Sequence, residues 1–141
     1  MPALSENLYF ITGTDANDNF IKASSLTYPP AHSGVQTYYT EKVKGDGYYG
    51  GQGLHTVTYV PWYEGPGGQL VINNFIGDVI IEASLATDPL EGDWFPISST
   101  ATTFDTQYHI NTFHNFTGNF VWIRAKVDIS AGVLTSILYN H

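Results

Sequence analysis

The chain contains no cysteine and few basic residues, and each deficit excludes a class of protein. Without a thiol it has no disulfide, no thiolate metal site and no cysteine nucleophile. Its 5 Lys and Arg residues stand against 13 Asp and Glu residues, which gives a formal net charge of -8 at pH 7. Nucleic-acid binding needs several basic side chains on one face to neutralise phosphates. We therefore expect no nucleic-acid partner.

Membrane-spanning and secretory signals are also missing from the sequence. No apolar run approaches the roughly 20 residues that a transmembrane helix needs. The first residues lack the basic start and the apolar core of a secretory signal. We expect a soluble protein without a membrane partner.

Charge is scarce and aromatic rings are frequent. Charged residues make up 13% of the 141 residues, against a usual figure of about 25%, and aromatic residues make up 15%. A tyrosine ring buries apolar area at little entropic cost and keeps a polar edge, which suits protein interfaces and sugar contacts. The scarcity of charge favours a protein interface over sugar contacts. A chain of 141 residues suits a single domain.

Two segments of the C-terminal half show the clearest strand pattern. In residues 79–85, apolar side chains recur at every second position, and the same alternation continues through 121–129. In the second segment, Trp122, Arg124 and Lys126 occupy the alternate positions. This pattern is typical of a strand with one buried face and one solvated face.

Eight short segments have strand character, and turn residues separate them. They are residues 35–43, 54–60, 69–75, 77–85, 94–98, 108–115, 119–129 and 133–139. Such spacing without an amphipathic helix predicts an all-β antiparallel sandwich, with a jelly roll as the first topology. Residues 1–34 contain mostly turn chemistry, so we expect an extended N-terminal arm, with one short strand near Asn7 to Ile11, before one β-sandwich domain over 35–141.

No motif predicts a catalytic, cofactor or metal site. Residues 15–19 begin like an EF-hand calcium loop, but Phe20 stands where that loop needs glycine, so we predict an ordinary Asx turn. Glu64, Glu82, Glu91 and Asp93 are catalytic candidates only by residue type, and Glu91 and Asp93 lie in a compact turn where we expect solvated carboxylates. The five histidines lack metal-ligand spacing and are expected at the surface or in an interface: His32, His55, His109, His114 and His141. We expect no enzymatic activity and no cofactor.

Paired aromatic residues are the more informative feature. Neighbouring residues of a strand point to opposite sides, so of Tyr38 and Tyr39 one ring should enter the core and the other should be exposed. The exposed ring could belong to a subunit interface. In the alternative interpretation, one of these rings joins Tyr59, Trp62 and Tyr63 as stacking platforms of a carbohydrate-binding module.

Four segments together show a resemblance to a known group of proteins. They are residues 79–85, 92–97 with a central Trp94, 116–127 with a Gly118-Asn119 turn and Arg124, and the glycine-led 132–138. This succession resembles β-sandwich modules, jelly-roll or discoidin-like, of tailed-bacteriophage virion proteins. The resemblance covers roughly residues 77–141 and concerns architecture, because the group has no catalytic residues to transfer.

The resemblance implies a non-enzymatic structural protein located in the virion, as a capsid decoration, neck, tail or fibre component. Its partners would be other virion proteins and further copies of itself, with a glycan as the partner in the carbohydrate-binding alternative. Trp122, Arg124 and Lys126 share the outer side of one strand on an acidic protein, so this strip, with Tyr38 and Tyr39, is the expected docking surface.

Overall fold

The structure, a computed structural model, describes residues 5–29, 33–45, 53–64, 67, 70–72, 75–105 and 111–140. Its strands are β1 (Ser5–Asn7), β2 (Phe10–Thr14), β3 (Phe20–Ala23), β4 (Leu26–Thr27), β5 (Gln36–Tyr39), β6 (Val43–Lys44), β7 (Leu54–Val60), β8 (Trp62–Glu64), β9 (Leu70–Ile72), β10 (Ile76–Ser84), β11 (Phe95–Phe104), β12 (Thr112–Thr117), β13 (Trp122–Ala131), β14 (Val133–Leu134) and β15 (Ser136–Asn140), with one 3-10 turn, η2 (Glu91–Asp93). No helix in this described part of the chain is long and apolar enough to cross a bilayer.

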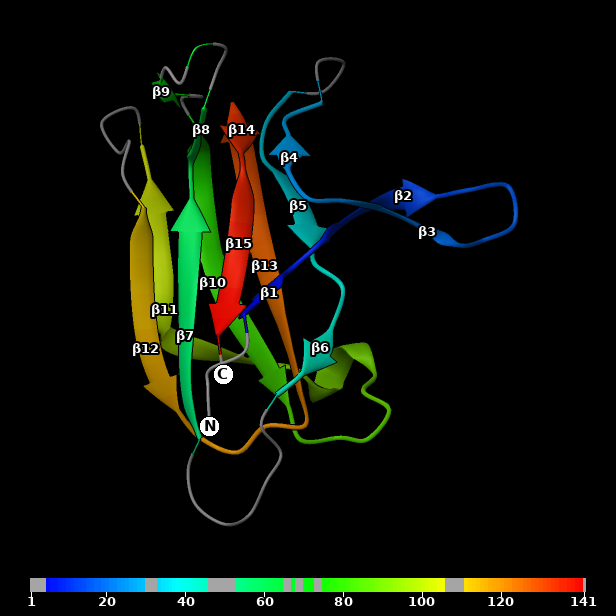
Figure 1. The fold of residues 1–141 in the computed structure, drawn as a ribbon. Coiled ribbons are helices and arrows are strands. Elements are labelled where there is room, and N and C mark those ends of the chain that lie inside the picture. Colours follow the sequence, from blue (N-terminus) through cyan, green and yellow to red (C-terminus); the bar gives the residue numbers. More distant parts are fainter. Residues whose placement is uncertain are drawn as a thin grey trace.

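Eight of the strands form two sheets that pack against each other (Figure 1). The four-stranded sheet has the order β1-β15-β7-β12, and the other has the order β11-β10-β13-β5, to which the short β6 adds a fifth strand by pairing with β13. Within them the first strand pairs with the last, the second with the seventh, the third with the sixth and the fourth with the fifth: β1 with β15, β5 with β13, β7 with β12, and β10 with β11. All four pairs are antiparallel, as if one long hairpin had been rolled up, which is the jelly-roll arrangement. The predicted all-β sandwich is confirmed.

The N-terminal segment differs from the expected extended arm. Its strand β1 forms the edge of the four-stranded sheet, and Leu8, Phe10 and Leu26 are buried in the core. The short strand expected near Asn7 to Ile11 is divided between β1 and β2, and β1 packs into the sandwich because it pairs with β15 from the other end of the chain. The predicted strand at 69–75 instead contributes β9 to a small hairpin with β8, outside the two main sheets.

The hairpin formed by β2 and β3 projects away from the sandwich (Figure 1). Its turn is held by the Asp15 carboxylate, which accepts the backbone N–H of Asn17 at 2.8 Å and that of Asn19 at 2.9 Å. These two bonds lower the pKa of the Asp15 carboxyl. Asp18 adopts a left-handed conformation with φ 62, which Asp tolerates better than most residues. The predicted Asx turn is confirmed.

The core lies between the two sheets and takes the inward side chains of both. On β10 and β13 these are the predicted alternating apolar residues, with Val79, Ile81, Ile123 and Val127 at most 1% exposed. The alternation ends earlier than expected on β10. Leu85 follows the last residue of that strand and is 62% exposed.

An irregularity in β11 is closed by one buried threonine. Val79 pairs with Thr102 and Ile81 pairs with Ile97, so residues 98–101 lie opposite Ile80 alone. Thr100 Oγ1 accepts the Ile81 N–H at 2.9 Å and donates to the Ile97 carbonyl at 2.7 Å. The side chain therefore replaces ladder bonds that the bulge removes.

The same threonine also links the two sheets. From the opposing sheet, the Tyr59 hydroxyl donates to the Thr100 carbonyl at 2.8 Å. Burial raises the pKa of the Tyr59 hydroxyl far above its ordinary range, so the group stays protonated and remains a donor. The bulge in β11 is thus held by hydrogen bonds within its own sheet and by one from the opposing sheet.

Two histidines are less exposed than the sequence suggested. His55 is fully buried, stacked on Phe116 with ring centroids 4.8 Å apart, so its expected surface position is wrong. Its Nε2 lies 2.8 Å from the Gly118 carbonyl and its Nδ1 lies 2.6 Å from the Tyr139 hydroxyl. A carbonyl only accepts, so Nε2 holds the hydrogen and, in the neutral ring, Nδ1 accepts from tyrosine.

His114 is half-buried on β12, and its Nε2 is hydrogen-bonded to the Thr102 hydroxyl. Desolvation lowers the pKa of His114. His32, His109 and His141 lie outside the described residues.

We expect Thr100→Val to lower the free energy of unfolding by about 1–3 kcal/mol, because it leaves the buried Ile81 N–H without an acceptor at nearly unchanged volume. Chemical denaturation measures this loss. Thr103→Val is the matched control, since Thr103 lies exposed on the same strand and donates only to Asp78. Equal effects of the two substitutions would contradict the role assigned to Thr100.

We expect the stability to depend on pH through His114. A lowered pKa means that the folded state binds fewer protons than the unfolded state near the ordinary histidine pKa of 6.5. The His114 contribution is therefore fully present above pH 6.5 and is lost as the pH falls below it. Unfolding curves between pH 5 and 7.5 should show a smaller decline for His114→Gln than for the parent. Parallel declines would contradict this assignment.

Candidate functional site

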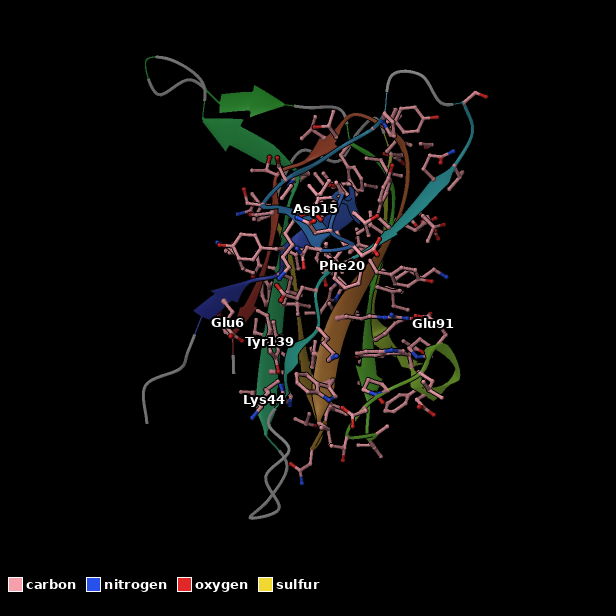
Figure 2. The ribbon with its side chains drawn as sticks, turned by 90° about the vertical axis from the view of Figure 1, so that its right-hand side faces the viewer. Glu6, Asp15, Phe20, Lys44, Glu91 and Tyr139 are labelled. Atoms are coloured by element: carbon pink, nitrogen blue, oxygen red, sulfur yellow. The ribbon has the colours of Figure 1, made fainter. Side chains whose placement is uncertain are left out.

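A groove of about 720 Å³ lies on the outer face of the five-stranded sheet. Its floor consists of β13 and β5, one wall is the projecting β2–β3 hairpin, and the other wall is the segment around η2. Figure 2 views this face, with Phe20 of the hairpin and Glu91 of η2 on either side of the groove. The lining residues are Ile11, Phe20, Thr37, Tyr38, Tyr39, Thr40, Glu41, Lys42, Pro89, Glu91, Trp94, Trp122 and Arg124.

Arg124 occupies the centre of this floor and is only 8% exposed. Its guanidinium carbon lies 4.1 Å from the ring centroid of Tyr39 and 4.3 Å from that of Trp94. The two rings come from opposite sides of β13, because the sheet order places β5 on one side of it and β11 on the other. The planar cation therefore holds two aromatic rings in fixed positions.

Two carboxylates neutralise Arg124. Its Nε donates to Glu82 at 2.8 Å, and Glu82 is its cross-strand partner on β10. The other two nitrogens contact both oxygens of Glu91 at 3.4 Å, a long distance for an ion pair. The Glu82 side chain is 14% exposed, whereas that of Glu91 is 81% exposed. Glu82 is thus the structural partner, and Glu91 remains open to solvent.

The remaining charges of the groove are also paired or stacked. Lys22 on the hairpin contacts Glu41 at 2.8 Å, which ties the hairpin wall to the chain after β5. Lys42 Nζ lies 4.9 Å from the ring centroid of Trp122, and the Trp122 indole N–H donates to the Thr87 carbonyl at 2.8 Å. The groove is therefore aromatic and close to neutral.

The expected docking strip is only partly available for contact. Trp122, Arg124 and Lys126 do lie on the outer side of β13, as the alternation predicts. Arg124, however, is buried under two rings and neutralised, so it offers no free charge to a partner. Of the tyrosine pair, Tyr38 packs against the core, whereas Tyr39 lies on the outer side over Arg124.

One of the sugar platforms expected in the alternative interpretation is not accessible to a ligand. Tyr59 is fully buried and its hydroxyl is bonded to Thr100, so no face of its ring is open to a sugar. That expectation is wrong because β7 points Tyr59 inward, together with Val57. The side chains of Trp62 and Tyr63 lie outside what the structure describes.

Sequence reasoning missed most of the groove lining. Phe20 and Glu91 come from turn-rich segments without periodicity, Trp94 opens a predicted strand, and only the fold brings these residues to β13. A weak signal existed for Trp94, because a large ring beside a compact acidic turn must pack somewhere. For Phe20 the sequence offered no such signal, and its only use was to argue against a calcium loop at residues 15–19.

The outer face of the other sheet has a different character. Residues paired across an antiparallel ladder share a side of the sheet, so the partners of the outward β7 residues also point outward. We call these positions the neutral face: Asn7, Leu54, Thr56, Thr58, Val60, Phe113, Asn115, Thr117, Ser136, Leu138 and Asn140. None of these described residues is charged. The outer side of β10 and β13 has five charged residues, Asp78, Glu82, Arg124, Lys126 and Asp128.

Neither protein-family models nor curated proteins match this chain. The described residues also contain no group of three or more His, Asp or Glu side chains that could hold a metal ion. Among the described residues, the groove and the neutral face are two surfaces that suit binding.

We expect Arg124→Met to lower the free energy of unfolding by about 3 kcal/mol, because it leaves the Glu82 carboxylate nearly buried and without its cation. Denaturant titration measures this loss. Adding Glu82→Gln to the same chain should recover part of it. Lys22→Met is the control, because it removes the exposed ion pair with Glu41. It should lower the free energy of unfolding by less than about 1 kcal/mol. Equal losses for Arg124→Met and Lys22→Met would contradict the structural role of Arg124.

Proposed function

We propose that this protein is a non-enzymatic structural component of a tailed-bacteriophage virion that assembles with copies of itself. The observation that supports assembly most directly is the neutral face. Its described outward positions have no charged side chain, on a chain whose net charge is -8. We infer that this face packs against the same face of a second copy.

Charge distribution is the physical reason for choosing this face. Two copies of an acidic protein repel each other, and the repulsion is weakest where neither surface has ionised groups. Interface cores are depleted of charge and enriched in aromatic rings. Phe113 is 65% exposed and Leu54 is 64% exposed on the neutral face, so both have apolar area left to bury.

The polar residues of the neutral face suit the same contact. Thr and Asn side chains both donate and accept, so two copies can satisfy each other's hydrogen bonds in a flat packing of sheets. Thr56 Oγ1 already donates to Asn115 Oδ1 at 2.7 Å across the ladder. Such side chains are held in place, and less entropy is lost when a partner orders them.

The virion assignment rests on the fold and on the resemblance of residues 77–141 to β-sandwich modules of phage virion proteins. Jelly rolls occur in viral capsid proteins, and they occur in lectins as well. Capsid decoration, neck, tail and fibre positions all fit such a module. Mass spectrometry of purified phage particles from cells that contain the gene tests this assignment, and absence of the protein from the particles would overturn it.

We expect Thr58→Lys to break the assembly into monomers. Thr58 pairs with Phe113 on one side and with Leu138 on the other, so it lies in the middle of the neutral face. A lysine there would bring two like charges together in the contact and leave them desolvated. Light scattering coupled to size-exclusion chromatography measures the mass of both proteins.

Thr103→Lys is the matched control, because Thr103 is exposed on the outer side of the other sheet. We expect it to retain the assembly of the parent protein. A monomeric parent would exclude self-assembly, and an unchanged mass for Thr58→Lys would show that the neutral face is not the contact.

A further inference from the structure

We propose that the groove over Arg124 is a binding site for a neutral saccharide. The groove lies on the sheet face opposite to the neutral face, so self-assembly through that face leaves it open. Its volume of about 720 Å³ falls within the range of roughly 300–1,000 Å³ that small-molecule sites span. The inference is independent of the proposed virion role.

The rings of the groove form a platform that exists before any ligand binds. Tyr39 and Trp94 are fixed by the Arg124 guanidinium, and Trp122 is fixed by its bond to Thr87 and by Lys42. A platform that is already ordered loses little entropy on binding. The C–H face of a pyranose ring is apolar and flat, and packs on such rings as other apolar groups do.

The charges of the groove favour a ligand without charge. Arg124 is neutralised by Glu82 and Glu91, and Lys22 is paired with Glu41. An anionic ligand would have to displace a carboxylate from Arg124 on a protein of net charge -8, at a cost in Coulomb energy. A cationic ligand would compete with Arg124 for the same carboxylates.

Hydrogen-bonding groups at the rim match the hydroxyls of a sugar. Glu91 is 81% exposed, and its long contacts to Arg124 leave acceptor capacity on both oxygens. The Tyr39 hydroxyl has no hydrogen-bond partner among the described residues, so it can donate or accept. Platform and rim together suit the apolar face and the polar edge of one sugar.

Phe20 completes the wall opposite to Glu91 and provides the sharpest test. It is 60% exposed on the hairpin, so replacing it removes ring area from the groove without opening the core (Figure 2). Ile21 is the next residue of β3 and is 48% exposed, but it is not part of the groove lining. Phe20→Ala and Ile21→Ala therefore form a matched pair.

The experiment titrates the full chain with maltotriose, cellotriose and triacetylchitotriose, with trigalacturonate as the anionic comparison. Trp94 and Trp122 are two of the three tryptophans of the chain, so a ligand in the groove should change the intrinsic fluorescence. We expect at least one neutral trisaccharide to bind. Phe20→Ala should weaken that binding roughly tenfold, whereas Ile21→Ala should leave it unchanged.

Three results would overturn the proposal. The first is that no neutral trisaccharide changes the fluorescence. The second is that trigalacturonate binds more tightly than every neutral sugar. The third is that Phe20→Ala and Ile21→Ala weaken binding equally. Phe20→Ala must also leave any assembly of the chain intact, since dissociation would make the groove a contact between copies.

Discussion

Arg124 is the residue on which the organisation of the outer sheet surface depends, because a cation that is 8% exposed requires both compensation and enclosure. Glu82 supplies the compensation across the ladder from β10, and the rings of Tyr39 and Trp94 supply the enclosure. These partners come from three separate stretches of the chain. Their convergence fixes the segment around η2 to the sheet, and with it one wall of the groove. The structural ion pair and the aromatic floor of the groove are thus parts of one arrangement of atoms.

The alternation of apolar residues in β10 and β13 placed Arg124 on the outer side of its strand. It could not show that Arg124 is buried there. Period-two patterning separates inward from outward residues, and the structure follows it from Val79 to Ala83 and from Ile123 to Ile129. An outward position on a strand is not an exposed one when loops fold over it. The residues that cover Arg124 are distant in sequence, and no local pattern relates Trp94 to β13.

The same distinction explains the other differences between sequence and structure. The sandwich was predictable because turn residues punctuate strands at regular intervals. The packing of the N-terminal segment into the core was not, because β1 has only three residues and its partner β15 lies at the other end of the chain. Tyr59 shows the converse. An aromatic residue that sequence composition allows at a surface is placed by strand parity in the core, where Thr100 occupies its hydroxyl.

The two outer faces of the sandwich differ in a way that a single pressure for solubility does not explain. One has five charges on β10 and β13 alone, and the other has none at its described outward positions. If solubility alone set the surface, acidic residues would be spread over both sheets, since an uncharged flat β surface invites association. Keeping charge off these outward positions leaves one face able to meet its own copy, while the net charge opposes contact elsewhere. On the groove side, Arg124 and Lys22 are paired with carboxylates and Lys42 stacks on Trp122, so the aromatic floor stays close to neutral.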